Sequence, residues 1–321
     1  MTIEVKDVTK RYGATVAVDH LSFTVRPGIV TGFLGPNGAG KTTTMRMLLG
    51  LDAPSSGEVT VDGRSYRSLP APMHAVGALL DAKAAFGGHT AAQHLRWLAQ
   101  AGGVPRRRVA EVLELVGLSD VAGRRVGGFS LGMYQRLGIA AALLGDPRIL
   151  LFDEPVNGLD PEGIRWIRSF LQHLAAEGRT IFLSSHLMSE MEETADHIIV
   201  IGRGRLIADA SIAAFTQGST SSHVRVVSPQ ATALAALLER AGATVRSADG
   251  ALTITGMEAP QIGRLAAEHN FELQELTTRR ASLEVAFMEL TETSQQYQAG
   301  TSDAPAISET AHALVGTGTG S

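Results

Sequence analysis

Short apolar runs separated by turns begin the chain. Alternating apolar positions within residues 3–25, broken at Gly13 and at Pro27–Gly28, predict strands. The run Ile29–Leu34 predicts a buried strand that leads directly into glycines, and Thr42–Leu49 has the apolar spacing of a helix. The pattern therefore predicts a strand, a glycine-rich loop and a helix in succession, which is the setting that a phosphate-binding loop requires.

The middle of the chain changes from helical spacing to an alternation of strands and helices. Three amphipathic segments predict helices at Ala91–Ala101, Arg106–Val116 and Leu131–Leu144. Short β-rich runs then alternate with a predicted helix at Pro161–Glu177. These runs are Ile149–Phe152, Thr180–Ser184 and Ile198–Ile201. Such alternation predicts an α/β domain with a parallel sheet, interrupted by a helical insertion at about residues 85–144.

After about Ala214 the pattern predicts a second, smaller unit. Its elements follow the order strand, helix, strand, strand, helix, strand, at 224–227, 231–241, 244–247, 252–255, 260–269 and 271–276. That order resembles the split β-α-β of a ferredoxin-like module, and a short helix is predicted after it at Ser282–Leu290. We therefore divide the chain into a first domain at 1–214, an accessory or regulatory module at 215–291 and a tail at 292–321. The Ser, Thr, Gly and Gln content of the tail predicts disorder.

Composition and charge exclude several classes of protein. The 321 residues carry a net charge of −4, which gives no support for a protein that neutralises nucleic-acid phosphates, and we expect no nucleic-acid partner. The absence of cysteine excludes disulfides and thiolate metal sites. The charged N-terminus is not a signal sequence, and no apolar stretch approaches the roughly 18 residues of a membrane span. If the protein works at a membrane, a partner must supply the part that crosses it.

The glycine-rich loop fits the phosphate-loop pattern G-x-x-x-x-G-K-[ST]. Its residues are Gly35, Pro36, Asn37, Gly38, Ala39, Gly40, Lys41, Thr42 and Thr43. Small residues let the backbone curl around a polyphosphate so that several N–H groups point inward. Lys41 would place a positive charge on the β- and γ-phosphates, and the Thr42 hydroxyl would bind Mg²⁺. With a strand before it and a helix after it, a chance glycine-rich turn is the weaker interpretation.

Two consecutive acidic residues end a later apolar strand. An aspartate at the end of such a strand would project its carboxylate beside the phosphate loop, where Mg²⁺ needs another oxygen, and Asp153 has that place. Glu154 is placed to act as the general base that polarises a water against the γ-phosphate. Alone, this pair would fit a solvated strand end equally well; the phosphate loop makes the catalytic interpretation the stronger one.

Five motifs follow one another along residues 2–212. After the phosphate loop come Phe129–Arg136 (FSLGMYQR), Phe152–Pro155, Asn157–Asp160 and Ser184–His186. This series resembles the ATP-binding subunits of ABC transporters and is far more specific than the phosphate loop alone. The resemblance implies an α/β fold of the P-loop NTPase type, with a mixed sheet core, an antiparallel β subdomain and the helical insertion. Here a small α+β C-terminal domain follows that fold.

The resemblance implies ATP and Mg²⁺ as cofactors and a site completed by a second copy of the chain. Ser130 and Gly132 would contact the γ-phosphate held by the partner copy, and the helix that starts near Leu131 would aim its N-terminus at the same phosphate. Asp160 would lie along the interface, and His186 would bind the γ-phosphate and hold the attacking water. Two ATP molecules would thus lie head to tail in a homodimer.

The position of Tyr12, in Lys10-Arg11-Tyr12-Gly13, matches that of the aromatic residue that stacks on adenine in this family. The alternative is a surface aromatic of a strand. An exposed ring before a glycine suits a flat base, which favours stacking.

Two departures from the family pattern narrow the resemblance. Leu131 and Met133 replace residues of the usual signature Leu-Ser-Gly-Gly-Gln, although Ser130 and Gly132 remain. Asp81 stands where the family usually has a glutamine that contacts Mg²⁺ and water. A carboxylate could still accept a hydrogen bond from a metal-bound water, but it adds negative charge beside ATP.

With these departures, the motifs of this chain resemble those of the bacitracin- and daunorubicin-resistance exporters, a subgroup of the family. The C-terminal segment Ser282–Thr291 also resembles the C-terminal helix of that subgroup. The subgroup implies a homodimer with a separate transmembrane permease of the ABC-2 type, held at the cytoplasmic face of the membrane. It also implies export of an antibiotic, peptide or lipid-like molecule. Two alternatives remain, a soluble ABC ATPase without a transport role and a nucleotide-dependent regulator that does not hydrolyse ATP.

Overall fold

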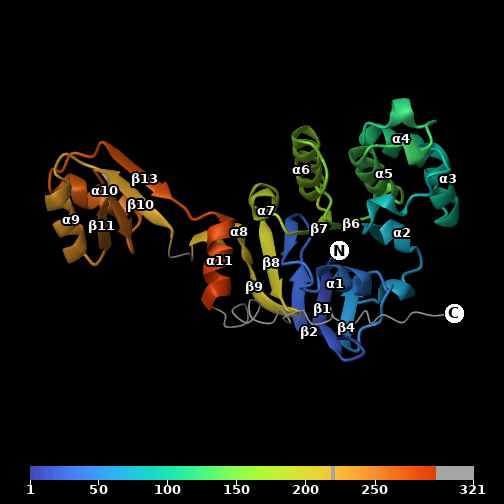
Figure 1. Cartoon of the computed structure of the whole chain (residues 1–321), viewed down its shortest axis with the longest axis horizontal. Coiled ribbons are helices and arrows are strands. Elements are labelled where there is room, and N and C mark those ends of the chain that lie inside the picture. Colours follow the sequence, from blue (N-terminus) through green and yellow to red (C-terminus); the bar gives the residue numbers. More distant parts are fainter. Residues whose placement is uncertain (218–220, 249, 294–321) are drawn as a thin grey trace, which may run out of the picture.

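In the computed structural model, the described residues form three β-sheets with helices packed around them (Figure 1). The structure describes residues 1–217, 221–248 and 250–293; the tail predicted to be disordered lies outside them from residue 294 onward. Figure 1 shows the helical subdomain at one end of the molecule and the C-terminal sheet at the other, with the two remaining sheets between them.

An antiparallel sheet in the order β2-β1-β4 forms one layer of the N-terminal domain. Its strands are β1 (Ile3–Tyr12), β2 (Thr15–Val25) and β4 (Ser56–Val61). Alternate residues point to opposite faces of a strand, so Ile3 and Val5 of β1 are buried together with Leu21 and Phe23 of β2. Phe23 packs in turn against Phe33 of the core sheet, with ring centroids 5.5 Å apart.

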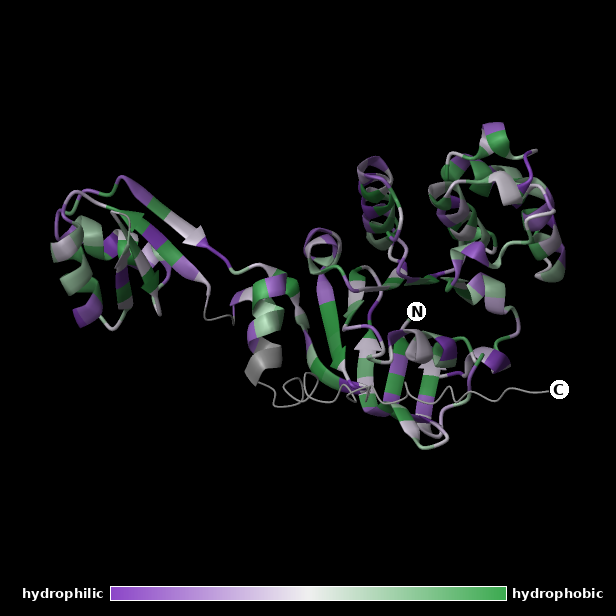
Figure 2. Ribbon diagram, viewed as in Figure 1, coloured by the Kyte–Doolittle hydropathy of each residue, from purple (hydrophilic) through white to green (hydrophobic). Residues whose placement is uncertain are grey.

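A six-stranded sheet in the order β5-β6-β7-β3-β8-β9 forms the core. All neighbours are parallel except β9, which pairs antiparallel with β8. The strands are β3 (Val30–Leu34), β5 (Val76–Leu79), β6 (Ile149–Asp153), β7 (Thr180–Ser185), β8 (His197–Gly202) and β9 (Arg205–Ser211). Parallel strands covered on both faces are apolar throughout, and Figure 2 shows β8 in the hydrophobic colour over most of its length.

The helices surround this sheet and build the insertion. The helical subdomain contains α3 (Ala91–Ala101), α4 (Arg107–Leu115) and α5 (Leu131–Leu143). The remaining helices of this domain are α1 (Lys41–Leu48), α2 (Pro72–Ala75), α6 (Pro161–Ala176), α7 (Met188–Thr194) and α8 (Ile212–Gln217). Short 3-10 turns lie at 66–68, 82–84, 119–121 and 126–128. Among the described residues, every helix is too short or too polar to cross a membrane.

Residues 221–281 form a ferredoxin-like module with a core of its own. The antiparallel sheet has the order β11-β12-β10-β13, and α9 and α10 pack on one face of it. The elements are β10 (His223–Val227), α9 (Ala231–Arg240), β11 (Thr244–Ala248), β12 (Ala251–Thr255), α10 (Ala259–Glu268) and β13 (Glu275–Arg279). The last helix, α11 (Leu283–Thr293), returns to the N-terminal domain and packs on α7 and α8.

The predicted fold class is confirmed, and one strand of the module differs from its prediction. The strand expected at 271–276 begins at Glu275 instead. α10 ends at Glu268, Asn270 follows with a positive φ of 54°, and the Phe271 N–H donates to the Ala266 carbonyl, which closes the helix and turns the chain away from it. Phe271 and Leu273 pack on the module core from an extended loop, so their apolar character reports burial rather than a strand.

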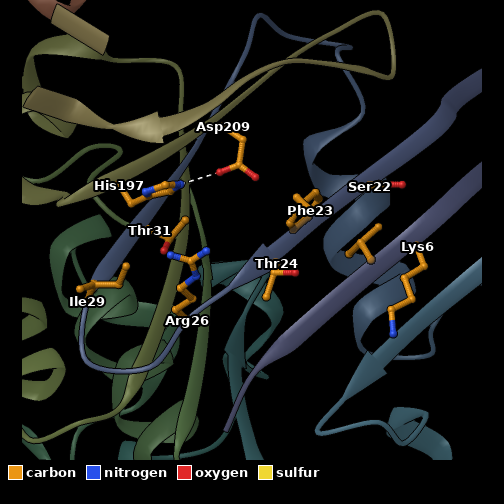
Figure 3. A pocket seen from close by; sticks show the side chains of 10 residues that line it. Lys6, Ser22, Phe23, Thr24, Arg26, Ile29, Thr31, His197 and Asp209 are labelled. Carbon is orange, nitrogen blue, oxygen red and sulfur yellow. Dashed lines mark hydrogen bonds and ion pairs between the residues drawn. The ribbon is translucent and has the colours of Figure 1, made fainter. Parts of the chain in front are cut away.

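A hollow of about 340 Å³ lies at the seam between the two sheets of the N-terminal domain (Figure 3). Phe23 of β2 and Arg26, which follows β2, line it on one side, and Thr31, His197 and Asp209 line it from the core sheet. His197 Nε2 lies 2.5 Å from Asp209 Oδ1, and this contact joins β8 to β9. The hollow lies at the amino ends of β3 and β8, whereas the phosphate loop lies at the carboxyl end of β3.

Candidate nucleotide-binding site

The phosphate loop joins the end of β3 to the start of α1, as the sequence predicts. Gly40 caps the helix with φ 106°, a conformation that side chains rarely adopt. A Cβ atom at this position would lie 2.6 Å from the carbonyl oxygen of Ala17, which is too close. The backbone can therefore follow this path only with glycine at residue 40.

Lys41 begins α1 and is buried, with only 6% of its surface exposed. Its ammonium donates to the carbonyl oxygens of Gly35 at 2.7 Å and Pro36 at 3.3 Å, so the side chain bends back over the loop. It also lies 3.8 Å from Glu154 Oε1. Burial lowers the pKa of Lys41 from its ordinary value, and the Glu154 carboxylate, with that of Asp153, opposes this shift.

Asp153 lies at the end of β6, with its carboxylate between two hydroxyl groups. The Thr42 hydroxyl donates to Asp153 Oδ2 at 2.6 Å, and the Ser184 hydroxyl donates to Asp153 Oδ1. Thr42 and Asp153 are 111 residues apart in the chain, and the sheet brings them into direct contact. Two oxygen-bearing side chains that the sequence assigns to Mg²⁺ thus meet beside the phosphate loop.

Glu154 follows Asp153 in a left-handed backbone conformation, with φ 52°. A non-glycine residue in this region costs about 1 kcal/mol, so neighbouring contacts must hold it there. The Ser184 hydroxyl accepts from the Glu154 N–H at 3.0 Å, and Glu154 Oε2 lies 2.9 Å from His186 Nδ1. The turn therefore directs the Glu154 side chain to Lys41 and His186 at once.

Tyr12 lies at the end of β1 and is 48% exposed. Its hydroxyl donates to Asp52 Oδ2 at 2.9 Å, and Asp52 also pairs with Arg46 at 2.7 Å. The Lys10 ammonium lies 4.8 Å from the ring centroid, so a cation covers one face of the ring. Desolvation, with the hydrogen bond to Asp52, raises the pKa of the Tyr12 phenol.

Ser130 and Asp160 each cap a helix. The Ser130 hydroxyl accepts from the Met133 N–H at 3.3 Å at the start of α5, and Asp160 Oδ1 accepts from the Gly163 N–H at 2.8 Å at the start of α6. Both residues have an extended backbone, as helix caps require. Within the described part of a single chain, no hydrogen bond or ion pair joins Ser130, Gly132 or Asp160 to the phosphate loop.

Asp81 lies two residues beyond the end of β5 and is exposed. Its carboxylate accepts from the Lys83 N–H at 2.8 Å and caps a short 3-10 turn. The cap orients the side chain without bringing it into hydrogen-bond contact with Thr42 or Asp153 among the described residues.

Sequence reasoning left Ser184 and Asp52 without a role. Ser184 is the neighbour of Asp153 in the parallel pairing of β6 and β7, so its place follows once these strands are adjacent. Asp52 meets Tyr12 across 40 residues, and no local pattern in the chain marks that contact.

A phosphate loop between β3 and α1, with an aspartate and a glutamate at the end of a second parallel strand, defines a P-loop ATPase. Residues 18–157 match the family described as ABC transporter, and residues 222–284 match a domain of unknown function, DUF8746. The bacitracin transport ATP-binding protein BcrA of Bacillus licheniformis is 44% identical over 210 residues, which are 64% of this chain and 69% of that protein.

Two further comparisons extend the match. The uncharacterized ABC transporter ATP-binding protein YhcH of Bacillus subtilis (strain 168) is 37% identical over 300 residues, 92% of this chain and 98% of that protein. A solved dimeric structure of MJ0796, a bacterial ABC transporter cassette, has a TM-score of 0.60 and 25% identity, and covers 65% of this chain and 98% of that one. The chain belongs to the ABC transporter family and is one of its ATP-binding subunits, an ATPase; the resemblance inferred from the motifs is thereby confirmed.

Proposed function

We propose that the chain hydrolyses ATP at this site and thereby powers a separate membrane permease that exports an antibiotic or a related peptide or lipid-like molecule. The observation that carries the hydrolytic part is the convergence of side chains from the start of α1 and from the ends of β6 and β7, which are Lys41, Thr42, Asp153, Glu154 and His186. The named transport role of BcrA supports the exported class, and a permease of the ABC-2 type fits the subgroup motifs.

The donor set at Thr42 and Asp153 fits Mg²⁺. A hydroxyl and a carboxylate 2.6 Å apart offer two hard oxygen ligands, and Mg²⁺ usually takes one or two protein oxygens together with waters and substrate phosphates. No group of three or more acidic or histidine side chains in the described residues forms a metal site by itself, which agrees with an ion shared with the nucleotide. Bound there, Mg²⁺ would neutralise charge on the phosphates.

Glu154 would act as the general base and His186 would position the water. Glu154 Oε2 lies 2.9 Å from His186 Nδ1, so a water that replaces this contact would be held by both side chains. Lys41 lies on the other side of the carboxylate and would stabilise the charge on the γ-phosphate. The proton of the attacking water would pass to Glu154.

A second copy of the chain would complete the site through Ser130 and Gly132, with Asp160 along the interface. Ser130 lies at the N-terminus of the 13-residue helix α5, where backbone N–H groups and the helix dipole favour an anion. Leu131 beside it is 40% exposed, so this helix end can meet a partner. The dimeric form of MJ0796 supports a dimer of two such chains, and a head-to-tail arrangement would bring each Ser130 to the phosphate loop of the other copy.

Cross-linking can test the dimer because the chain contains no cysteine. In a Glu154→Gln background, Asn37→Cys combined with Leu131→Cys is expected to give a covalent dimer with a short bis-maleimide when ATP and Mg²⁺ are present. The matched control carries Asn37→Cys with Leu115→Cys, which is also exposed but lies on α4. Equal cross-linking of the two pairs, or none with ATP, would remove the head-to-tail dimer from the proposal.

Removal of the Tyr12 ring is expected to raise the KM for ATP. Stacking of a base on an aromatic side chain contributes about 1–3 kcal/mol, so Tyr12→Ala should raise KM by at least about fivefold at unchanged kcat. Tyr12→Phe keeps the ring and loses only the hydrogen bond to Asp52, so it should stay close to the wild type. Steady-state phosphate release measures both, and similar KM values for Tyr12→Ala and the wild type would make the ring structural.

The proposed transport role can be tested by identifying the proteins that co-purify with the chain from membranes. The affinity-tagged chain, expressed with its own host's membrane proteins and extracted in mild detergent, is expected to retain a multi-helix permease. Export of bacitracin by vesicles that contain this complex should require ATP and should stop with Glu154→Gln. Hydrolysis by the purified chain without any retained membrane protein would leave the ATPase assignment intact and contradict the transport proposal.

A further inference from the structure

The short helix α7 connects directly to the histidine of the site. Only Leu187 separates His186 from the first residue of α7. The Leu187 N–H donates to the Ser185 hydroxyl at 2.9 Å, which closes a tight link between β7 and α7. A shift of α7 would therefore move His186 relative to Glu154, its neighbour at 2.9 Å.

α7 is too short to be stable by itself, so its position depends on what packs against it. It contains seven residues and no side-chain cap at its N-terminus, and a helix of this length is unstable alone. Met191 and Thr194 are its buried residues, and Met191 packs closely over Gly32 of β3. The core sheet and the two helices packed against α7, which are α6 and α11, therefore fix its position together.

Acidic residues of α7 bind two different helices. Arg168 of α6 lies 3.4 Å from Glu190 and also pairs with Glu193. Glu192 points to the other side, where its Oε2 accepts from the Leu283 N–H at 3.0 Å, in the first turn of α11. A carboxylate at a helix N-terminus is favourable because the free N–H groups and the helix dipole attract negative charge.

α11 is anchored in the N-terminal domain although it follows the ferredoxin-like module in the chain (Figure 1). Leu283 is fully buried and belongs to the same apolar cluster as Met191, whereas β10–β13 have a separate core. Only residues 280–282 lie between β13 and α11. The Ser222 hydroxyl accepts from the Ala281 N–H at 3.1 Å and donates to the Thr216 carbonyl at 2.8 Å. These two hydrogen bonds join the end of α8, the segment that enters the module and the segment that leaves it.

We propose that Glu192 and Leu283 are positioning residues for ATP hydrolysis, through which α11 holds α7 and thereby His186. The inference rests on the proposed role of His186. The module that precedes α11 is joined to it by a three-residue link, so a displacement of β13 would act on α7 and change turnover rather than ATP binding. The ferredoxin-like module thus has a physical connection to the hydrolytic step.

The two contacts can be removed separately. Glu192→Ala is expected to lower kcat about fivefold, with KM for ATP within about twofold of wild type, because the phosphate loop and Tyr12 are untouched. Glu192→Gln keeps an acceptor for the Leu283 N–H and should restore most of the loss. Leu283→Ala should lower kcat at least as much.

The matched controls are exposed positions in the same turn of α11. Glu284→Ala and Val285→Ala should leave kcat unchanged.

A double-mutant cycle separates positioning from general destabilisation. In a His186→Ala background, single-turnover hydrolysis should show no further loss with Glu192→Ala, because the residue that α7 positions is already absent. A fivefold loss in both backgrounds, or a rise in KM that accounts for the effect, would overturn the inference. If Leu283→Ala does not fold, the Glu192 variants still decide. Absence of hydrolysis in the wild type would instead contradict the proposed function.

Discussion

Glu154→Gln is expected to lower ATP turnover by about a hundredfold or more, because general-base catalysis contributes about that much and an amide cannot take the proton of the attacking water. Glutamine has the same shape as glutamate and retains an oxygen that can face His186, which lies 2.9 Å from the present carboxylate. It removes the negative charge 3.8 Å from Lys41, so the affinity for ATP should be kept or raised. The protein should accumulate as an ATP-bound dimer.

Phosphate release and the mass of the complex in solution measure the two parts of this prediction. Turnover should fall while light scattering after gel filtration with ATP and Mg²⁺ detects a stable dimer. Glu114→Gln makes the same chemical change on an exposed face of α4 and should behave as the wild type. A Glu154→Gln variant that retains most of its turnover would show that another group activates the water.

The parts of the site that could be predicted from the sequence are those carried by contiguous residues. The phosphate loop needs glycines where the backbone turns sharply, and Gly40 with φ 106° meets that need within a few residues of Lys41. Asp153 and Glu154 stand at the end of an apolar strand, and adjacent parallel strands end at one edge of a sheet. Local patterns of this kind can be recognised in the sequence without knowledge of the fold.

Contacts that depend on tertiary structure could not be predicted. The hydrogen bond between Tyr12 and Asp52 and the pairing of Asp153 with Ser184 join distant parts of the chain. In the proposed dimer Ser130 would reach the phosphate loop of the second copy, a role that only the family resemblance implies, and the Ser130 hydroxyl in the single chain caps α5 instead. These relations require strand order, loop paths or symmetry, and hydrophobic periodicity encodes none of them.

Short elements were missed for a physical reason. β5 has four residues and includes Gly77, where a Cβ would lie 1.9 Å from the Ala142 carbonyl oxygen, so close packing excludes any side chain at residue 77, including the branched ones typical of a strand. α7 buries only Met191 and Thr194. Two apolar or small positions do not establish a period of 3.6, and packing on α6 and α11 determines the helix instead.

Lys41→Ala is expected to weaken ATP binding by at least about thirtyfold, since removing one partner of a buried charge contact costs about 2 kcal/mol or more. Burial has lowered the pKa of this ammonium, because the buried charge is poorly solvated. A bound phosphate would stabilise the charged form of Lys41, and this attraction is lost in the alanine variant. Isothermal titration with a non-hydrolysable ATP analogue and Mg²⁺ measures the effect directly.

The control must account for the structural contacts of the same side chain, because the Lys41 ammonium also donates to the Gly35 and Pro36 carbonyls. Lys41→Met keeps most of the aliphatic stem and removes the charge, so it should lose affinity as Lys41→Ala does if charge is responsible. Lys83→Ala removes an exposed lysine outside the loop and should bind as the wild type does. Normal affinity in Lys41→Met, with a loss only in Lys41→Ala, would assign Lys41 to shaping the loop rather than to binding phosphate.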